Sequence, residues 1–534
     1  MGMSEPEAHD TVNLSTHPNA PTASPARASN AVVTATDPNP PAESRAAVTA
    51  SAQSHPALQI HHQAQQEFAR FILQSSTAPA GNLAADAVRW ACSQLATGAS
   101  PRALCAAVLD VAAEIQSGST RLAGLKNNPR TTAALVTAVS AAIQLSERQE
   151  NSIRPGAATD SEAAVIAAVL VVASAAEALQ PAANSPIEKA PQLTPSSSPL
   201  ADFWLATSSG RPAQAMRSWL QLAEVDSIEA RDALNSAATL RFSAEEQFLI
   251  VPAALALASP ATHTHHQLLC CVVGQISCVE VDEEFATDFR MQAQILAEDA
   301  LDRSPETHGR FERATHERMT ALATGIARTP PERLPLLLLA SLEDGLTPED
   351  LVDTLALLRA AAYSITSSRD TSEQDSLAAL TACIAADAVQ LCMTRTTSLS
   401  LRYELALAAP SSPSATQLSN LAELCVPPSD SGGLADMLLA VAEGDPESAS
   451  DAAAAIPPED HASTDTAWCA LRRAVAGDYS MQMQRLVHVT ALERGFRNTD
   501  HPAKIWFLAA AARSAAQARS QPHPLATLAT DILS

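Results

Sequence analysis

The chain has 534 residues; 46% are hydrophobic but only 3% are aromatic, and alanine dominates the apolar part. Its 34 basic and 58 acidic residues give a formal net charge of −24, which repels nucleic-acid phosphates and anionic membrane surfaces. We therefore expect neither a nucleic-acid partner nor a membrane partner. Alanine has the highest helix propensity and strand-like alternation is scarce, so the composition predicts an all-α protein.

Residues 1–65 are rich in Pro, Ser, Thr, Ala and Asn and lack apolar periodicity. Such a segment buries too little apolar surface to offset the entropy of ordering, so we expect a disordered N-terminal arm. The opening stretch MGMSEPEAHD has neither the basic nor the apolar region of a secretory signal. Nine scattered cysteines without a CxxC pair are typical of reduced thiols. Both features predict a cytoplasmic protein.

After the arm, alternation between helical patterns and Pro/Ser-rich breaks divides the chain. A first helical lobe is expected over 66–280, with a linker at 181–199. An acidic helical connector follows over 281–330, then a second helical lobe over 331–520 and a C-terminal tail over 521–534. The charge-free run at 163–176 is shorter than the roughly 20 residues that a membrane span needs, so it predicts a buried core helix.

Two stretches, GASPRALCAAV from Gly98 and GLTPEDLVDTL from Gly345, share the pattern Gly-x-(Ser/Thr)-Pro-x-x-Leu. Ser100 and Thr347 are residue types that cap helix N-termini, and a proline follows each at the first helical position. Each stretch therefore predicts a helix start. Apolar helical patterns precede and follow both stretches, which indicates that the likeness extends beyond the shared heptapeptide.

Further matches recur in the same order. LADFWLATSSGRP begins at Leu200 and LADMLLAVAEGDP at Leu434. A longer stretch from Ser243 aligns without a gap on one from Asp478. These matches predict that the two lobes are an internal duplication and that they pack pseudo-symmetrically. Unrelated alanine-rich helices also resemble one another, which is the alternative.

The duplication singles out a histidine cluster as the first candidate site. His263, His265 and His266 lie in the first lobe, and in the alignment His265 and His266 match Asp500 and His501 in the second. Imidazoles bind divalent metals and transfer protons near neutral pH. If the lobes pack about a pseudo-twofold axis, these residues converge on one metal or acid–base site. The alternative is that histidines at helix starts act as caps or face solvent.

Two weaker candidates also consist of residue types that bind metals. His308, Glu312 and His316 are spaced four apart and share one helix face, where they would bind a metal or form a solvated, ion-paired surface. Cys270 and Cys271 follow the histidine cluster, but adjacent helical residues diverge by about 100°, so buried core cysteines are expected.

The most basic helix of the second lobe is a third candidate. It either holds an anionic ligand or forms a solvated helix end. Its charged and imidazole residues are Arg485, His488, Glu493, Arg494 and Arg497.

The sequence contains no phosphate-binding loop, dinucleotide fingerprint, zinc-protease motif or nucleophile elbow. We therefore predict a binding or scaffold protein that offers an inter-lobe groove to a protein partner or small ligand. The alternative is a His-based, metal-dependent or acid–base helical enzyme, possibly an oxidoreductase, with its site between the lobes.

Overall fold

In the computed structural model, the first described helix begins at Pro56, where the larger of the two units of the chain also begins. The described residues are 56–75, 83–116, 142, 157–178, 198–240, 283–303, 314–330, 333–365, 373–396, 398–409, 432–479, 483–520 and 523–533, with scattered positions in 269–281. Over these residues the secondary structure is helical and contains no strand, so the all-α prediction is confirmed for this part of the chain.

The first half of the unit contains α2 (Pro56–Ser75), α3 (Leu83–Ala96), α4 (Pro101–Gln116), α6 (Ala157–Ala178), α7 (Pro199–Ser208), α8 (Pro212–Val225), α9 (Ser227–Thr239) and α12 (Glu283–Arg303). The second half contains α13 (His316–Arg328), α14 (Leu334–Glu343), α15 (Pro348–Ile365), α16 (Glu373–Arg395), α17 (Leu399–Ala408), α18 (Leu434–Glu443), α19 (Pro446–Ala454), α20 (His461–Ala476), α21 (Gln484–Asn498), the short 3₁₀ helix η7 (Pro502–Lys504), α22 (Ile505–Ser520) and α23 (Pro524–Leu533).

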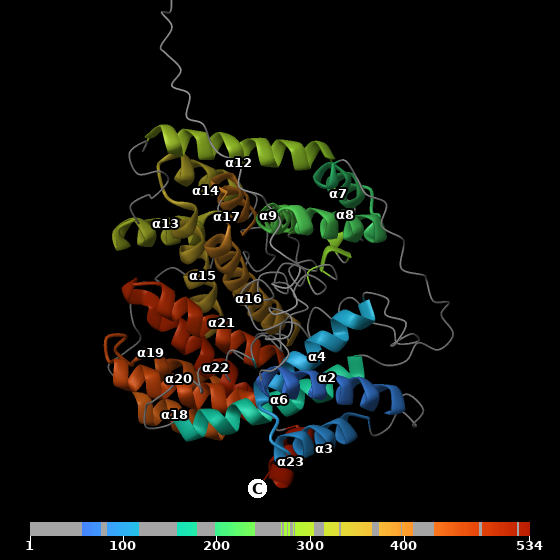
Figure 1. The fold of residues 1–534 in the computed structure, drawn as a ribbon. Helices are drawn as coiled ribbons and strands as arrows, with labels where there is room; N and C mark the ends of the chain where they lie inside the picture. Colours follow the sequence, from blue (N-terminus) through green and yellow to red (C-terminus); the bar gives the residue numbers. More distant parts are fainter. Residues whose placement is uncertain are drawn as a thin grey trace, which may run out of the picture. The chain divides into compact units, whose positions relative to one another are not determined.

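The charge-free run at 163–176 forms most of α6 and is a core helix, as predicted. Ala164, Val169 and Val172 are fully buried, and α6 contacts α3, α4, α20 and α23 (Figure 1). Small alanine side chains allow these helices to approach closely. In the part of the chain that the structure describes, no helix is both long and apolar enough to cross a membrane.

The predicted helix starts at Ser100 and Thr347 are confirmed. Ser100 Oγ accepts a hydrogen bond from the backbone N–H of Ala103 at 3.1 Å, and Thr347 Oγ1 accepts one from Asp350 at 3.0 Å. Each cap satisfies one of the N–H groups that a helix N-terminus leaves without an intrahelical partner. Ser100 and Thr347 therefore have a structural role as helix caps.

The helix ends that precede these caps also match. Gly98 and Gly345 have φ angles of 102° and 87°, a left-handed conformation that glycine adopts without a Cβ penalty. The same backbone bond closes both ends, from Ala99 N to Gln94 O at 3.0 Å and from Leu346 N to Ser341 O at 3.1 Å.

A second pair of loops matches in the same way. Gly210 after α7 and Gly444 after α18 have φ angles of 64° and 76°. The closing bonds run from Arg211 N to Ala206 O at 2.9 Å and from Asp445 N to Ala440 O at 3.0 Å. Each loop leads into a helix with proline in its first turn, α8 or α19, and the next helix in each case is capped by an aspartate, Asp226 or Asp460.

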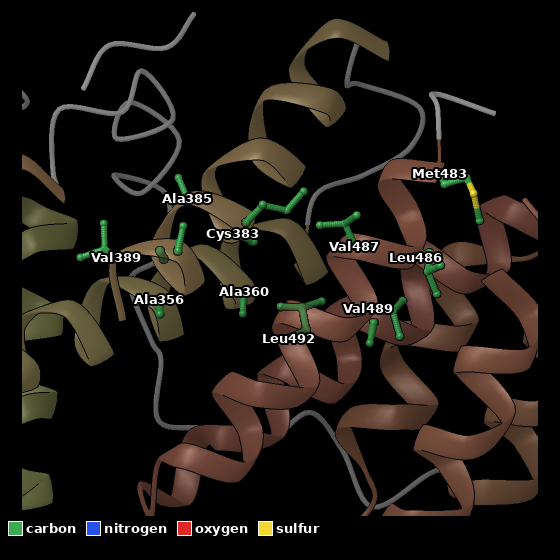
Figure 2. Packing of buried hydrophobic residues seen from close by; sticks show 14 of the residues in the cluster. Ala356, Ala360, Cys383, Ala385, Val389, Met483, Leu486, Val487, Val489 and Leu492 are labelled. Atoms are coloured by element: carbon green, nitrogen blue, oxygen red, sulfur yellow. The ribbon is translucent and has the colours of Figure 1, made fainter. Parts of the chain in front are cut away.

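The core of the second half is built from α15, α16, α21 and α22, which contact one another. Figure 2 shows the small side chains Ala356, Ala360 and Cys383 facing Val487 and Leu492 of α21. Contacts also cross the boundaries predicted between lobes, since α6 packs on α20 and α9 packs on α17. Helices of the first predicted lobe therefore pack on helices of the second at two places, α6 on α20 and α9 on α17.

Two helices begin in segments that the sequence prediction set outside the two lobes. Helix α2 begins at Pro56, inside the segment expected to be a disordered arm, because Phe68 and Ile72 at helical spacing give it a buried face. The predicted C-terminal tail contains α23, which packs on α3 and α6 and buries Ala529 completely. Residues 1–55 and the predicted linker at 181–197 lie outside the described residues.

Candidate ligand-binding site

Several of the predicted site residues lie outside the described residues. These are His263, His265, His266, Cys270, Cys271, His308 and Glu312. The predicted convergence of His266 with His501 therefore stays a prediction. His501, Asp500, His316 and the charged residues of α21 are described.

His501 is a buried residue at the start of η7, with 4% of its surface exposed. Its Nδ1 accepts a hydrogen bond from the backbone N–H of Ala503 at 3.1 Å, and its Nε2 lies 3.2 Å from Thr320 Oγ1. Since Nδ1 is an acceptor, the proton of the neutral ring is on Nε2, which donates to Thr320. His501 thus caps a helix through one nitrogen and contacts α13 through the other.

The ring of His501 contacts the ring of His316 of α13. The sequence placed His316 in a different candidate site, together with His308 and Glu312. The two ring centroids lie 5.2 Å apart in an edge-on arrangement. Burial lowers the pKa of His501, and the charge of His316 lowers it further. Asp500 is exposed beside this pair. Within the described residues, no group of three or more His, Cys, Asp or Glu side chains is arranged to hold a metal ion.

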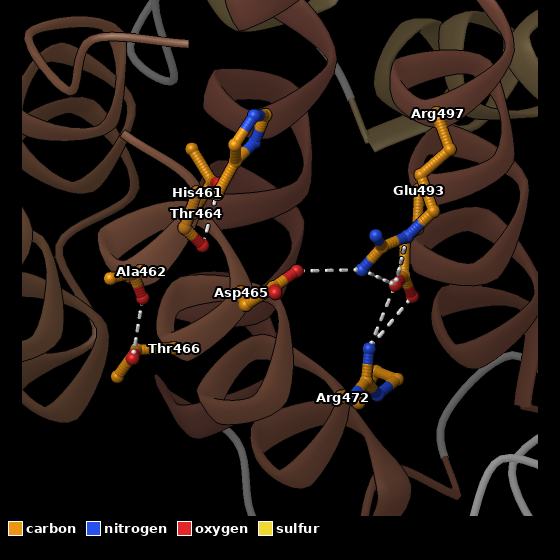
Figure 3. A network of polar contacts seen from close by, with 8 residues as sticks. All are labelled: His461, Ala462, Thr464, Asp465, Thr466, Arg472, Glu493 and Arg497. Carbon is orange, nitrogen blue, oxygen red and sulfur yellow. Dashed lines mark hydrogen bonds and ion pairs between the residues drawn. The ribbon is translucent and has the colours of Figure 1, made fainter. Parts of the chain in front are cut away.

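The basic helix α21 is an internal element, and carboxylates pair with its arginines. Glu493 is fully buried and accepts from Arg472 at 2.9 Å and from Arg497 at 2.9 Å. Arg497 also reaches Asp465 of α20 at 3.1 Å. Figure 3 shows Glu493 between the two arginines, which tie α20 to α21.

The other two arginines of α21 are paired in the same manner. Arg494 forms a two-pronged bond with Asp387 of α16 at 2.8 and 2.6 Å, and Arg485 bonds Asp478 at 2.9 Å. Two-pronged arginine–carboxylate bonds fix both position and orientation. The positive charges that the sequence offered for an anionic ligand are therefore used to dock α21 against its neighbours.

His488, on the same helix, is completely buried, and neither ring nitrogen has a hydrogen-bond partner among the described residues. Its ring packs edge-on against Tyr363 of α15, with centroids 5.0 Å apart. Burial, with a smaller contribution from the charge of Arg485, lowers the pKa of His488 to about 3. The ring is therefore neutral at physiological pH.

A pocket of about 310 Å³ opens where α7 and α12 approach each other, beside the end of α9. We call it the α7–α12 pocket. Its walls are mostly apolar and include one cationic side chain, which is the composition of many small-ligand sites. The residues that line it are Trp204, Leu205, Thr207, Ser208, Leu240, Val281, Ala286, Thr287 and Arg290.

Arg290 is held against the wall of this pocket by an aromatic ring. Its guanidinium carbon lies 3.8 Å from the ring centroid of Trp204, a cation–π contact. Its Nε is buried and has no hydrogen-bond partner among the described residues. Burial lowers the pKa of Arg290 from its ordinary value of 12.5, and the charge of Glu404 opposes this effect.

Glu404 of α17 is a buried carboxylate whose charge acts on Arg290. Its carboxylate accepts a hydrogen bond from Ser236 Oγ of α9 at 2.6 Å. Burial raises the pKa of Glu404, whereas the bond from Ser236 and the charge of Arg290 lower it. The pocket therefore combines a cation whose Nε has no described hydrogen-bond partner, an aromatic ring and several apolar side chains.

Sequence reasoning did not find this pocket. Arg290 belongs to the segment predicted as an acidic connector, and Trp204 to a helix recognised only for its match with residues from Leu434. The available signal was the rarity of the residue types, since the chain has only five tryptophans. Comparisons with protein-family models, with curated proteins and with solved structures found no match to this chain.

Proposed function

We propose that this chain is a helical binding protein and that the α7–α12 pocket holds its ligand. The observation that carries the proposal is Arg290, a cation in this pocket that lies over the ring of Trp204 and has a buried Nε that no described residue bonds. A buried donor without a partner costs free energy, and a bound ligand would recover it. The pocket lies between the predicted first lobe and the connector, whereas the sequence placed the groove between the two lobes.

The test is a screen of small molecules of fragment size by thermal shift, on the wild type and on Ser208→Trp. The new indole would fill the pocket from its α7 wall. We expect a set of molecules, of whatever charge, to raise the Tm of the wild type and to leave the Tm of the variant unchanged. If every stabilising molecule acts equally on both proteins, the pocket is not the binding site and the proposal fails.

A His-based metal or acid–base site is the second candidate function. The edge-on contact between His316 and His501 favours it, since it brings two imidazoles from separate elements together. Elemental analysis of the purified protein, followed by His316→Ala and His501→Ala, tests it. Stoichiometric metal that both variants lose would support it, and metal-free protein with unchanged behaviour in both variants would remove it.

We also propose that the two halves arose by internal duplication. The matched glycine loops and closing backbone bonds after α3 and α14, and after α7 and α18, support this interpretation. An experimental structure resolving residues 241–268 would test it. Equivalent helices there, with His266 superposing on His501, are expected, and a different helix order would contradict the duplication.

A cytoplasmic location is likewise a proposal. The described cysteines Cys92, Cys105, Cys383, Cys392 and Cys469 form no disulfide with one another, which supports a reducing environment. Cell fractionation with an antibody to the chain would test it.

A further inference from the structure

The environment of Arg290 indicates the chemical class of ligand that fits the α7–α12 pocket, provided that the pocket has the proposed binding function. The guanidinium carbon of Arg290 lies over the ring of Trp204, 3.8 Å from the ring centroid. The N–H groups of a guanidinium lie in its plane and form a rigid fork of donors along its edge. A planar anion that approaches this edge can accept two parallel hydrogen bonds, as carboxylates do.

The charge around Arg290 limits how negative the ligand is. The chain carries a formal net charge of −24, and the buried Glu404 already interacts with Arg290. Among the described residues that line the pocket, Arg290 is the only cation. A phosphate or dicarboxylate brings about two negative charges to a single guanidinium and meets repulsion from Glu404. A single carboxylate matches the available charge.

The rest of the pocket favours an apolar body attached to that carboxylate. Leu205, with 53% of its surface exposed, and the methyl group of Ala286 lie on opposite helices of the pocket. Leu205 is an exposed apolar side chain that a ligand would cover. The hydroxyl of Thr207 is bonded to the Phe203 carbonyl, so it does not compete for the ligand. A volume of about 310 Å³ is at the small end of the range for ligand pockets.

From these observations, we propose that the α7–α12 pocket binds a small monocarboxylic acid with an aromatic or branched apolar body, whose carboxylate is anchored by Arg290. Trp204 positions the guanidinium, and the apolar walls hold the body of the ligand.

The experiment compares two probes of the same shape, 3-phenylpropionate and the neutral 3-phenylpropionamide, by titration calorimetry on the full chain. Three proteins are titrated: the wild type, Arg290→Met, which keeps an apolar stem over Trp204, and Ser208→Trp, which fills the pocket. Circular dichroism checks that each is folded. If Arg290→Met does not fold, Arg290→Gln replaces it with the same expectation.

We expect the carboxylate to bind the wild type at least tenfold more tightly than the amide, and to lose this advantage in Arg290→Met. The affinity of the amide should be the same in the wild type and in Arg290→Met. Ser208→Trp should bind neither probe. Equal affinity of the two probes for the wild type, or an unchanged carboxylate affinity in Arg290→Met, overturns the carboxylate assignment.

The outcome also separates this inference from the proposed function. If the amide binds the wild type as tightly as the carboxylate does, and Ser208→Trp abolishes the binding of both, the pocket is a binding site and the carboxylate assignment alone is wrong. If binding of both probes persists in Ser208→Trp, the pocket itself is wrong, and both proposals fail together.

Discussion

At the scale of single residues, the buried polar side chains of this protein divide by how their hydrogen-bonding capacity is used. Glu493 is fully buried but accepts from two arginines, which offsets the cost of removing its charge from water. His488 and Arg290 each have a buried nitrogen without a described partner. His488 avoids the cost of burying a charge because its ring is neutral, whereas Arg290 remains charged beside a pocket. These two residues therefore give different predictions.

Replacing His488 should make the protein more tolerant of acid. Its pKa is lowered from 6.5 to about 3 in the folded state, so the unfolded chain binds a proton that the folded chain excludes. The contribution of His488 to the free energy of unfolding is therefore fully present above about pH 6.5 and is lost as the pH falls toward 3. The loss amounts to up to about 5 kcal/mol, at about 1.4 kcal/mol per pKa unit. In His488→Phe, which keeps a ring against Tyr363, urea denaturation between pH 7 and pH 4 should show a shallower loss.

The matched control is His461→Gln, which changes an exposed histidine at the start of α20. It should follow the wild-type curve. A His488→Phe protein that loses stability with acid as steeply as the wild type would show that His488 does not carry the effect.

Neutralising Glu404 should tighten binding of a carboxylate in the α7–α12 pocket. Glu404→Gln keeps an acceptor for Ser236 but removes the negative charge that interacts with Arg290. Removing about 1 kcal/mol of repulsion corresponds to roughly a fivefold gain in affinity. Titration with 3-phenylpropionate measures it, and titration with 3-phenylpropionamide, whose affinity should not change, is the control. Weaker or unchanged carboxylate binding would count against a role for this charge.

At the scale of elements, helix starts and ends were the most predictable features. Ser100, Thr347 and the glycines before them act within a few residues, and such local chemistry can be read directly from sequence. The candidate site was not predictable in the same way. Arg290 meets Trp204 only because α12 packs beside α7, and no local pattern encodes that approach. His501 was identified as a candidate, but its contact with His316 was not foreseen for the same reason.

The aspartate caps of α9 and α20 should contribute equally to stability. Asp226 accepts from the backbone N–H groups of Ile228 and Glu229, and Asp460 accepts from that of Ser463. Loss of such a cap costs about 1 kcal/mol. We expect Asp226→Ala and Asp460→Ala each to lower the free energy of unfolding by about this amount in urea titrations. Glu459→Ala, a change at an exposed neighbour of Asp460, should have little effect, and a loss as large as that of Asp460→Ala would argue against the cap.

At the scale of the whole unit, helices far apart in sequence depend on one another. Helix α6 packs on α20, and Arg473 of α20 pairs with Glu162 of α6 at 2.5 Å. Helix α23 packs on α3 and α6 near the other end of the chain. The division into two lobes predicted from the repeat did not anticipate these contacts. A sequence repeat indicates which segments are related to each other, but it does not indicate which segments pack together.

A charge placed under α23 should destabilise helices that lie more than 300 residues earlier. Ala529 is completely buried, so Ala529→Asp puts a carboxylate among apolar groups, at a cost of about 3 kcal/mol. Hydrogen exchange should show faster exchange in α3 and α6. The control Ile532→Asp changes a residue with 44% of its surface exposed and should leave α3 and α6 protected. Identical exchange in both variants would show that α23 does not stabilise these helices.

The contact of α6 with α20 and α23 has a consequence for how the protein is made. A ribosome completes α6 at Ala178 long before it reaches His461, where α20 begins. At about 5–20 residues per second, the delay is on the order of tens of seconds. Throughout that time α6 can pack only on the helices made before it, α3 and α4, and not on α20 and α23. The surface that α6 presents to α20 and α23 therefore stays without these partners until most of the chain has been made.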